Sequence, residues 1–483
     1  MQKQSSTTEE EKYNLFRVIF LAFVAAIGGF LFGFDSGVIN GTVDALQSAF
    51  NADAVGTGFN VASVLLGCAI GAFFAGTLAD KYGRKPMMLA TAVFFIISAW
   101  GSGISASSFE FVIYRLIGGF AVGAASILAP AYISEIAPAK IRGRLATLQQ
   151  LMIVIGLFAA FMSNYWLVGM SGGASELHWM EFQTWQWMFW AEILPASVFL
   201  VVLFFIPESP RYLVAAGKTE LAGNVLAKIS DPETAAAKVE DIKSTLREGS
   251  KPKLRDVISK YTGKVHALVW VGLGLAALQQ FTGINVIFYY GATLWKAAGF
   301  TESDALLTNV ISGSVNIFFT FVAIALIDRL GRKPLLLIGS LGQAVMLGIL
   351  AFIFGTASLD TAGNLMLSDS MGTVALLTAN GYIAFFAFSW GPVMWVMLGE
   401  MFPNQYRGAA LALSGLAQWI ANFVITMTFP ILLTSLGLGF SYGIYAFFGV
   451  VAYFFVKSLV KETKGRTLED MSREQDLEEQ KYA

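Results

Sequence analysis

Three charged side chains lie inside stretches of the chain that otherwise carry almost no charge. Asp35 lies in the first long apolar run, Arg115 in the fourth and Glu192 in the sixth. Burial opposes the ionisation of a carboxylic acid, whereas a nearby guanidinium favours it. A buried acid beside an arginine can therefore take up and release a proton when its surroundings change. We hypothesise that Asp35 does so, and that Arg115 then pairs with Glu192; the alternative is a static buried ion pair.

The elements that hold these charges must be long and apolar. Of the 483 residues, 56% are hydrophobic and 13% are charged, and the mean hydropathy is +0.63. Soluble domains carry about 25% charged residues, and a helix needs about 20 apolar residues to cross a bilayer core. We predict an all-α membrane protein whose twelve transmembrane helices lie near residues 18–38, 58–79, 86–106, 111–132, 146–168, 187–206, 266–290, 307–327, 335–354, 373–398, 409–430 and 438–457.

The positive charges are distributed unevenly over these twelve spans. Cationic loops are retained on the cytoplasmic side of a membrane. Thirty of the 32 Lys and Arg residues fall on one side of the predicted topology, and the exceptions are Arg115 and Lys296, at the outer end of the seventh span. An odd number of spans would scatter these charges over both sides. We therefore expect a multi-pass protein with both termini in the cytoplasm.

The two halves of the chain repeat one plan. The segment DKYGRKP, residues 80–86, follows the second span, and DRLGRKP, residues 328–334, follows the eighth. Two six-span halves in the same orientation are typical of parallel-repeat transporters, in which the substrate binds at the midplane and the halves rock. We expect a cytoplasmic N-terminal segment, an N-terminal half, a cytoplasmic helical linker, a C-terminal half and a cytoplasmic tail at residues 1–17, 18–206, 207–265, 266–457 and 458–483.

Charged groups of both signs recur at the predicted cytoplasmic ends of both halves. Such groups can join the halves while the inside is closed and separate when it opens. Topological anchoring is the alternative, but an anchor requires only the positive charges. The predicted cytoplasmic gate consists of Asp80, Arg84, Glu135, Arg142, Glu208, Arg332, Glu400, Arg407 and Glu462.

Six motifs follow one another along the chain. They are Gly76-x-Leu78-Ala79-Asp80-x-x-Gly83-Arg84-Lys85, Arg115-x-x-x-Gly119, Glu135 with Arg142-Gly143, Pro207-Glu208-Ser209-Pro210-Arg211, Gln279-Gln280-x-x-Gly283-Ile284-Asn285 and Gly391-Pro392-x-x-Trp395. Together these motifs resemble the sugar porter family of the major facilitator superfamily, and within it the bacterial symporters of D-xylose and protons. The resemblance covers almost all of the twelve spans. Two positions depart from the family pattern, Lys461 where Pro is usual and Gln186 where Arg is usual.

The resemblance implies import of a neutral monosaccharide across a bacterial inner membrane by proton symport, with Asp35, Arg115 and Glu192 as coupling residues. Amides suit a sugar because they donate and accept hydrogen bonds without charge, although a single amide can simply join two helices. We expect breaks at Gly283 and at Gly391-Pro392 to turn side chains into one cavity. The implied substrate-binding residues are Phe32, Gln150, Gln279, Gln280, Asn285, Tyr289, Asn316, Gly391, Trp395, Gln418 and Trp419.

Other classes of function find less support in the sequence. It contains no G-x-x-x-x-G-K-[ST] loop for nucleotide phosphates, and no Ser-His-Asp or metal-ligand cluster suggests an enzyme. We expect no cofactor, metal or nucleic acid, and a monomer whose partners are a sugar, a proton and the bilayer. A passive facilitator is the main alternative, and a sugar sensor of the same fold is another. The identity of the sugar and the choice between proton and sodium stay open.

Overall fold

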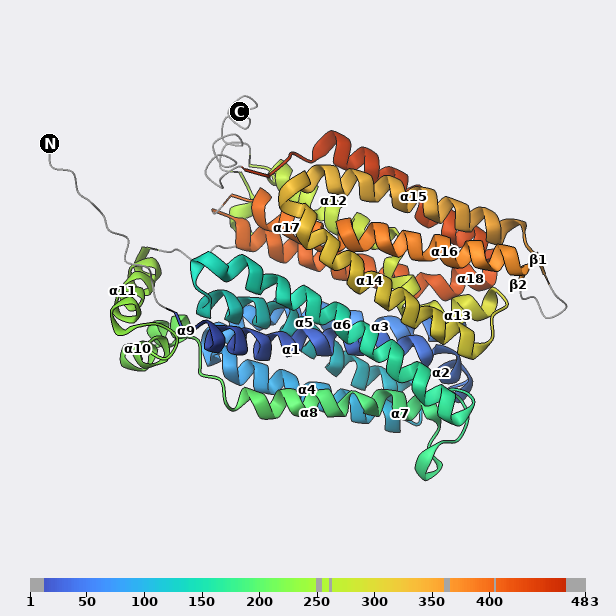
Figure 1. Ribbon diagram of the computed structural model, residues 1–483, viewed down its shortest axis with the longest axis horizontal. Coiled ribbons are helices and arrows are strands. Elements are labelled where there is room, and N and C mark those ends of the chain that lie inside the picture. The colour runs from blue at the N-terminus through green and yellow to red at the C-terminus, as the bar shows by residue number, and fades with distance from the viewer. Residues whose placement is uncertain (1–12, 249–253, 260–262, 360–364, 404, 466–483) are drawn as a thin grey trace.

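The computed structural model describes residues 13–248, 254–259, 263–359, 365–403 and 405–465. The described chain is almost wholly helical, and its long helices form two bundles that share one long axis (Figure 1). The N-terminal half is the blue to green bundle. Its elements are α1 (Leu15–Val38), the 3₁₀ turn η1 (Ile39–Gly41), α2 (Val43–Ala49), α3 (Ala54–Tyr82), α4 (Arg84–Ile104), α5 (Ser108–Ile136), α6 (Ala139–Ser171), η2 (Trp179–Glu181), α7 (Thr184–Ala191) and α8 (Ile193–Leu203).

The C-terminal half is the yellow to red bundle in Figure 1. A short antiparallel hairpin and one π-helical segment interrupt its helices. Its elements are α12 (Ala267–Phe281), α13 (Ile284–Ala297), α14 (Glu302–Leu330), α15 (Arg332–Thr356), β1 (Ser358–Leu359), β2 (Leu365–Met366), α16 (Asp369–Phe385), the π-helix η4 (Phe386–Trp390), α17 (Gly391–Met401) and α18 (Arg407–Leu459).

Eleven stretches of the described chain are long and apolar enough to cross a membrane. One of them, α18, has 53 residues and would be about 80 Å long if straight, far more than the roughly 30 Å of a bilayer core. Gly437, with φ 77° and ψ 174°, breaks α18 into two helices. The chain thus forms twelve membrane-crossing helices, which confirms the predicted fold class.

Short helices between the halves mark one end of the molecule. The helices α9 (Pro210–Ala215), α10 (Thr219–Leu226) and α11 (Pro232–Glu248) pack together and are followed by η3 (Leu254–Val257). The start of α1 joins them, because the backbone N–H of Asn14 donates to Ile229 O at 2.9 Å. We call this the linker end, and the opposite end, with η1, α2 and the β1–β2 hairpin, the hairpin end (Figure 1).

Small residues let α1 and α6 approach each other closely within the N-terminal half. Glycines occupy every fourth position from Gly29 in α1 to Gly41 in η1. A Cβ atom at Gly33 would lie only 1.9 Å from the backbone oxygen of Ile153 on α6, so any larger residue would push the helices apart. This packing fixes the face of α1 that carries Asp35.

Candidate functional site

Asp35 and Arg115 form a buried, two-point ion pair between α1 and α5. Arg115 Nη1 donates to Asp35 Oδ1 at 2.6 Å, and Nη2 donates to Oδ2 at 3.2 Å. Both side chains are 1% exposed. A bidentate pair of this kind is stronger and more specific in geometry than a single hydrogen bond. The structure therefore brings together the first two of the three charges that the sequence singled out.

Glu192, between α7 and α8, completes the group. It lies close enough for its charge to interact with those of both Asp35 and Arg115. It is 1% exposed, and within the part of the chain that the structure describes neither carboxylate oxygen has a hydrogen-bond partner. The Arg115 guanidinium is also 5.7 Å from the ring centre of Phe189 on α7, one turn before Glu192. Arg115 thus has a second carboxylate nearby, that of Glu192, which makes no hydrogen bond to the described residues.

The seventh span is broken at Gly283, as the sequence predicts. Gly283 has a φ of +83° and separates α12 from α13. The break allows an amide relay to form: Asn285 Nδ2 donates to Gln280 Oε1 at 2.6 Å, and Gln280 Nε2 donates to Gln279 Oε1 at 3.1 Å. Gln279 Nε2 then donates to the backbone oxygen of Trp390 at 2.8 Å. Three of the predicted substrate-binding residues therefore form one hydrogen-bonded chain.

The tenth span differs from the expectation at Gly391-Pro392. The helix does not break there but widens into the π-helical segment η4 immediately before Gly391. Proline lacks an N–H group and its ring crowds the carbonyl four residues earlier, and a π-helical bulge accommodates it without ending the helix. Trp395, one turn further along, is 40% exposed, so its ring is uncovered in this conformation.

Several of the other predicted substrate-binding residues lie where the two halves meet. Phe32 on α1 contacts Trp419 on α18, with ring centres 5.9 Å apart. The Tyr289 hydroxyl on α13 lies near Asp35 on α1, and Asn422 Nδ2 donates to it at 3.5 Å. Gln150, Asn316 and Gln418 stand apart from the amide relay; the last two are buried and Gln150 is half-buried.

The gate residues of the N-terminal half form a network at the linker end. Arg84 Nη2 donates to Glu135 Oε1 at 2.9 Å and lies 3.1 Å from Asp80 Oδ1. Glu208 accepts from the backbone N–H groups of Arg84 and Lys85, at 2.9 Å and 3.2 Å, at the start of α4. The Arg142 side chain lies outside the described part of the chain.

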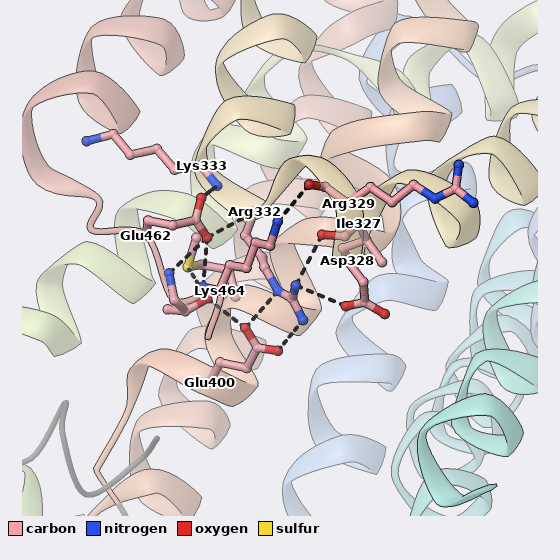
Figure 2. A network of polar contacts seen from close by, with 10 residues as sticks. Ile327, Asp328, Arg329, Arg332, Lys333, Glu400, Glu462 and Lys464 are labelled. Atoms are coloured by element: carbon pink, nitrogen blue, oxygen red, sulfur yellow. Dashed lines mark hydrogen bonds and ion pairs between the residues drawn. The ribbon is translucent and has the colours of Figure 1, made fainter. Parts of the chain in front are cut away.

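The C-terminal half repeats this network with matching residues (Figure 2). Arg332 donates to both oxygens of Glu400, at 2.9 and 2.7 Å, and lies 3.1 Å from Asp328. Glu462 accepts from the N–H groups of Arg332 and Lys333, both at 3.0 Å. Arg407, the remaining gate residue, donates from Nε to Phe402 O at 3.2 Å. The contacts named here lie within one half or the other, and the predicted latch between the halves stays a prediction.

The two carboxylates that cap α4 and α15 differ in their pKa. Burial raises the pKa of Glu208, and the N–H groups that donate to it offset this only in part. Burial acts in the same direction at Glu462, but the N–H groups of Lys464, Arg332, Lys333 and Thr463 outweigh it and lower the pKa of that carboxyl. The extra N–H donor favours the charged form of Glu462.

At the hairpin end, hydrogen bonds join the two halves around Asn40, which sequence reasoning missed. This side chain is 1% exposed and lies in η1. Its Oδ1 accepts from Ala292 N at 3.0 Å and Asn309 Nδ2 at 2.7 Å, and its Nδ2 donates to Phe288 O at 2.9 Å. Asp44 on α2 also pairs with Lys296 on α13 at 2.7 Å. Lys296 had stood out in the sequence as an exception to the charge bias.

Comparisons with known proteins agree with this architecture. The family model described as "Sugar (and other) transporter" matches residues 21–474. A glucose transport protein of Synechocystis sp. is 49% identical over 468 residues, which cover 97% of this chain and 99% of the relative. The D-xylose-proton symporter of Escherichia coli is 40% identical over 492 residues, covering 95% of this chain and 96% of the relative.

Solved structures of the E. coli xylose transporter XylE share the fold. Its partially occluded inward open conformation matches with a TM-score of 0.80 at 38% identity, covering 93% of this chain and all of that one. Its complex with 6-bromo-6-deoxy-D-glucose matches with a TM-score of 0.77 at 39% identity, covering 95% of this chain and 99% of that one. This chain therefore belongs to the Sugar (and other) transporter family, with the major facilitator fold.

Proposed function

We propose that the protein imports a neutral monosaccharide, D-glucose or D-xylose, by proton symport. The observation that carries the proposal is the buried Asp35–Arg115 pair with an unengaged Glu192 beside it. Leaving one partner of a buried pair charged and alone costs about 3–5 kcal/mol. A proton on Asp35 removes that cost at Asp35, and Glu192 offers Arg115 a replacement carboxylate.

The transport cycle follows from this exchange of partners. Asp35 takes up a proton from outside, Arg115 turns to Glu192, and the loaded protein rocks to expose its site to the cytoplasm. Sugar and proton then leave, and Arg115 returns to Asp35. Tyr289 supports coupling to the sugar, because its hydroxyl lies near Asp35 while its helix, α13, also carries Asn285. Sugar that binds to α13 can thereby change the surroundings of Asp35 across the interface between the halves.

The same proposal assigns an orientation and a conformation. We place the linker end, with residues 207–265 and both termini, in the cytoplasm, because almost all of the positive charge lies there. The hairpin end then faces outside, where Asn40 joins the halves. The structure is accordingly inward open, and its likeness to inward-open conformations of XylE supports this assignment. Residues 18–206 and 266–457 rock as units in a monomer.

Uptake by purified protein in proteoliposomes tests the proposal. Labelled D-glucose and D-xylose are offered with an imposed pH gradient, acid outside, with a sodium gradient, and with neither. We expect the pH gradient to drive accumulation above the external concentration of one of these sugars. Equilibration without accumulation in all three conditions would establish the passive facilitator instead. Accumulation driven by sodium alone would overturn the assignment of the proton.

A further inference from the structure

Two buried serines on α4 lack the hydrogen bond that similar residues make elsewhere in this chain. Serine and threonine hydroxyls inside helices commonly donate to the carbonyl four residues earlier. Thr91 in α4 donates in this way to Met87 O at 2.8 Å, and Ser105, directly after α4, donates to Gly101 O at 2.7 Å. Ser98 and Ser102 are 1% and 0% exposed, and neither hydroxyl has a hydrogen-bond partner among the described residues. A buried hydroxyl without a partner is unusual and indicates a functional or strained position.

The glycine at position 118 on α5 places Ser98 beside the ion pair. A Cβ atom built on Gly118 would lie 2.3 Å from Ser98 Oγ and 3.6 Å from Asp35 Oδ1. The two oxygens therefore face each other across this glycine, separated by no more than the sum of those distances. A hydrogen bond between them requires Asp35 to turn toward Ser98 once Arg115 has left it.

We propose that Ser98 is the hydrogen-bond partner that Asp35 takes when it carries the transported proton. The inference rests on the proposed function. In the present state both oxygens of Asp35 accept from Arg115, so Ser98 is not needed. Once Arg115 turns to Glu192, the protonated acid becomes a donor in a site without water contact and requires an acceptor.

The chemistry of a hydroxyl fits this position. Ser98 Oγ accepts the hydrogen bond from the Asp35 O–H, while its own O–H turns to the carbonyl of Phe94, four residues earlier. No donor is then left without an acceptor. Four titratable groups lie within electrostatic range of Asp35 on the elements packed around it: Arg115 on α5, Glu192 between α7 and α8, Cys68 on α3 and Tyr289 on α13. Ser98 is a neutral acceptor on α4 and is a positioning residue for the proton.

The pH dependence of proton-driven uptake tests this role. Ser98→Ala removes the acceptor, so the protonated form of Asp35 is less favoured and a more acidic outside is needed to load it. We expect the external pH of half-maximal uptake to fall by about half a unit to one unit, as loss of one net hydrogen bond implies. Gly118→Ala fills the space between the two oxygens and should shift the profile in the same direction.

Ser105→Ala is the matched control, because it removes a buried hydroxyl directly after the same helix, one that already donates to the helix backbone. Its pH profile should equal that of the wild type. Sugar counterflow at a fixed pH, which needs no net proton movement, identifies the variants that fold. A Ser98→Ala variant that exchanges sugar but keeps the wild-type profile, or shifts it to higher pH, would overturn the role of Ser98.

Asp35→Asn is measured in the same series to separate the two proposals. If Asp35→Asn still accumulates sugar on a pH gradient, the proposed role of Asp35 as the proton site fails, and the inference about Ser98 fails with it. If Asp35→Asn loses accumulation while the Ser98→Ala profile is unchanged, only the inference about Ser98 fails. The expected result is loss of accumulation in the first variant and an acid shift in the second.

Discussion

Glu208 and Glu462 hold equivalent positions in the two halves of the protein. Each carboxylate accepts hydrogen bonds from the first two backbone N–H groups of a helix, α4 for Glu208 and α15 for Glu462. Carboxylates are favoured at this end of a helix because its N–H groups are otherwise unpaired and carry partial positive charge. The repeat seen in the sequence is therefore a repeat of hydrogen-bonding geometry.

Loss of charge at these two caps should have unequal effects. Folding lowers the pKa of Glu462, so its ionised carboxylate stabilises the folded protein. This stabilisation is fully present above the pKa that Glu462 has in the unfolded chain, and it is lost as pH falls through the pKa that Glu462 has in the folded protein. We expect Glu462→Gln to lower the free energy of unfolding by about 1 kcal/mol at pH 7, and the difference from wild type to be smaller at a pH below 4.5, the ordinary pKa of this carboxyl. Thermal unfolding in detergent at the two pH values measures this.

Glu208→Gln is the matched comparison. The raised pKa of Glu208 means that folding favours its protonated form, so its contribution to stability decreases as pH rises through the folded pKa. At pH 7, Glu208→Gln should therefore lower the free energy of unfolding less than Glu462→Gln does, or should raise it. Equal losses in the two variants would contradict the difference that the hydrogen bonds predict.

Removal of the Asn40 side chain should open the hairpin end. Asn40→Ala leaves the groups of Ala292, Asn309 and Phe288 without their partner, and a buried group left unsatisfied costs about 1–3 kcal/mol. Because about 1.4 kcal/mol changes an equilibrium tenfold, the outward-open population should rise at least about fivefold.

Thiol labelling measures this change. In a Cys68→Ala background, Thr57→Cys places a thiol at a position that is 5% exposed and faces Tyr290 and Thr293 across the halves. Asn40→Ala should speed its reaction with an impermeant maleimide. A cysteine at the exposed Ser48 is the control and should react equally in both backgrounds. An unchanged rate at Thr57→Cys would show that Asn40 does not hold this end closed.

Arg115 should stabilise the fold chiefly by neutralising the acids around it. Arg115→Gln leaves Asp35 and Glu192 close together and buried, and breaking a buried pair in this way costs about 3–5 kcal/mol. The double variant Arg115→Gln/Asp35→Asn removes one of the two acids and should recover most of that loss. Thermal unfolding of both variants provides the test. A double variant no more stable than Arg115→Gln would argue against an electrostatic role.

Asn285 should contribute to sugar binding more than to stability. It stands at the end of the amide relay, half-buried, with its oxygen not used in the relay. Loss of one hydrogen bond to substrate typically costs about 1–2 kcal/mol, so Asn285→Ala should raise KM for sugar about tenfold with little change in thermal stability. Gln343→Ala, a buried amide on the peripheral helix α15, is the comparison and should leave KM unchanged. Equal KM values for Asn285→Ala and wild type would remove Asn285 from the sugar site.

The sequence predicted the fold well because its signals are local. The length of an apolar run, the charge of a loop and a repeated GRKP turn can each be read from a short stretch of sequence. The break at Gly283 follows from the conformational freedom of a single glycine. The tenth span widens into the π-helix η4, which could not be predicted. A proline indicates that a helix is distorted, but it does not determine whether the distortion is a break, a kink or a π-helical bulge.

Contacts between distant segments were harder to predict. Asn40 and Asn309 are single amides 269 positions apart, and nothing in either local sequence indicates that they meet. Ser98 was missed for a similar reason, since a serine in an apolar helix usually donates to its own backbone, and only the position of Gly118 distinguishes it. The pairing of Asp35 with Arg115 was expected because isolated charges in apolar spans must find a partner.

Sugar accumulation by Asp35→Asn in proteoliposomes tests the central claim most directly. Wild type and variant are compared for uptake on an imposed pH gradient and for counterflow, in which internal unlabelled sugar drives entry of labelled sugar without a gradient. The proposed coupling predicts that Asp35→Asn loses accumulation entirely and keeps counterflow near the wild-type rate. Accumulation by the variant equal to that of wild type would contradict the assignment of the proton to Asp35.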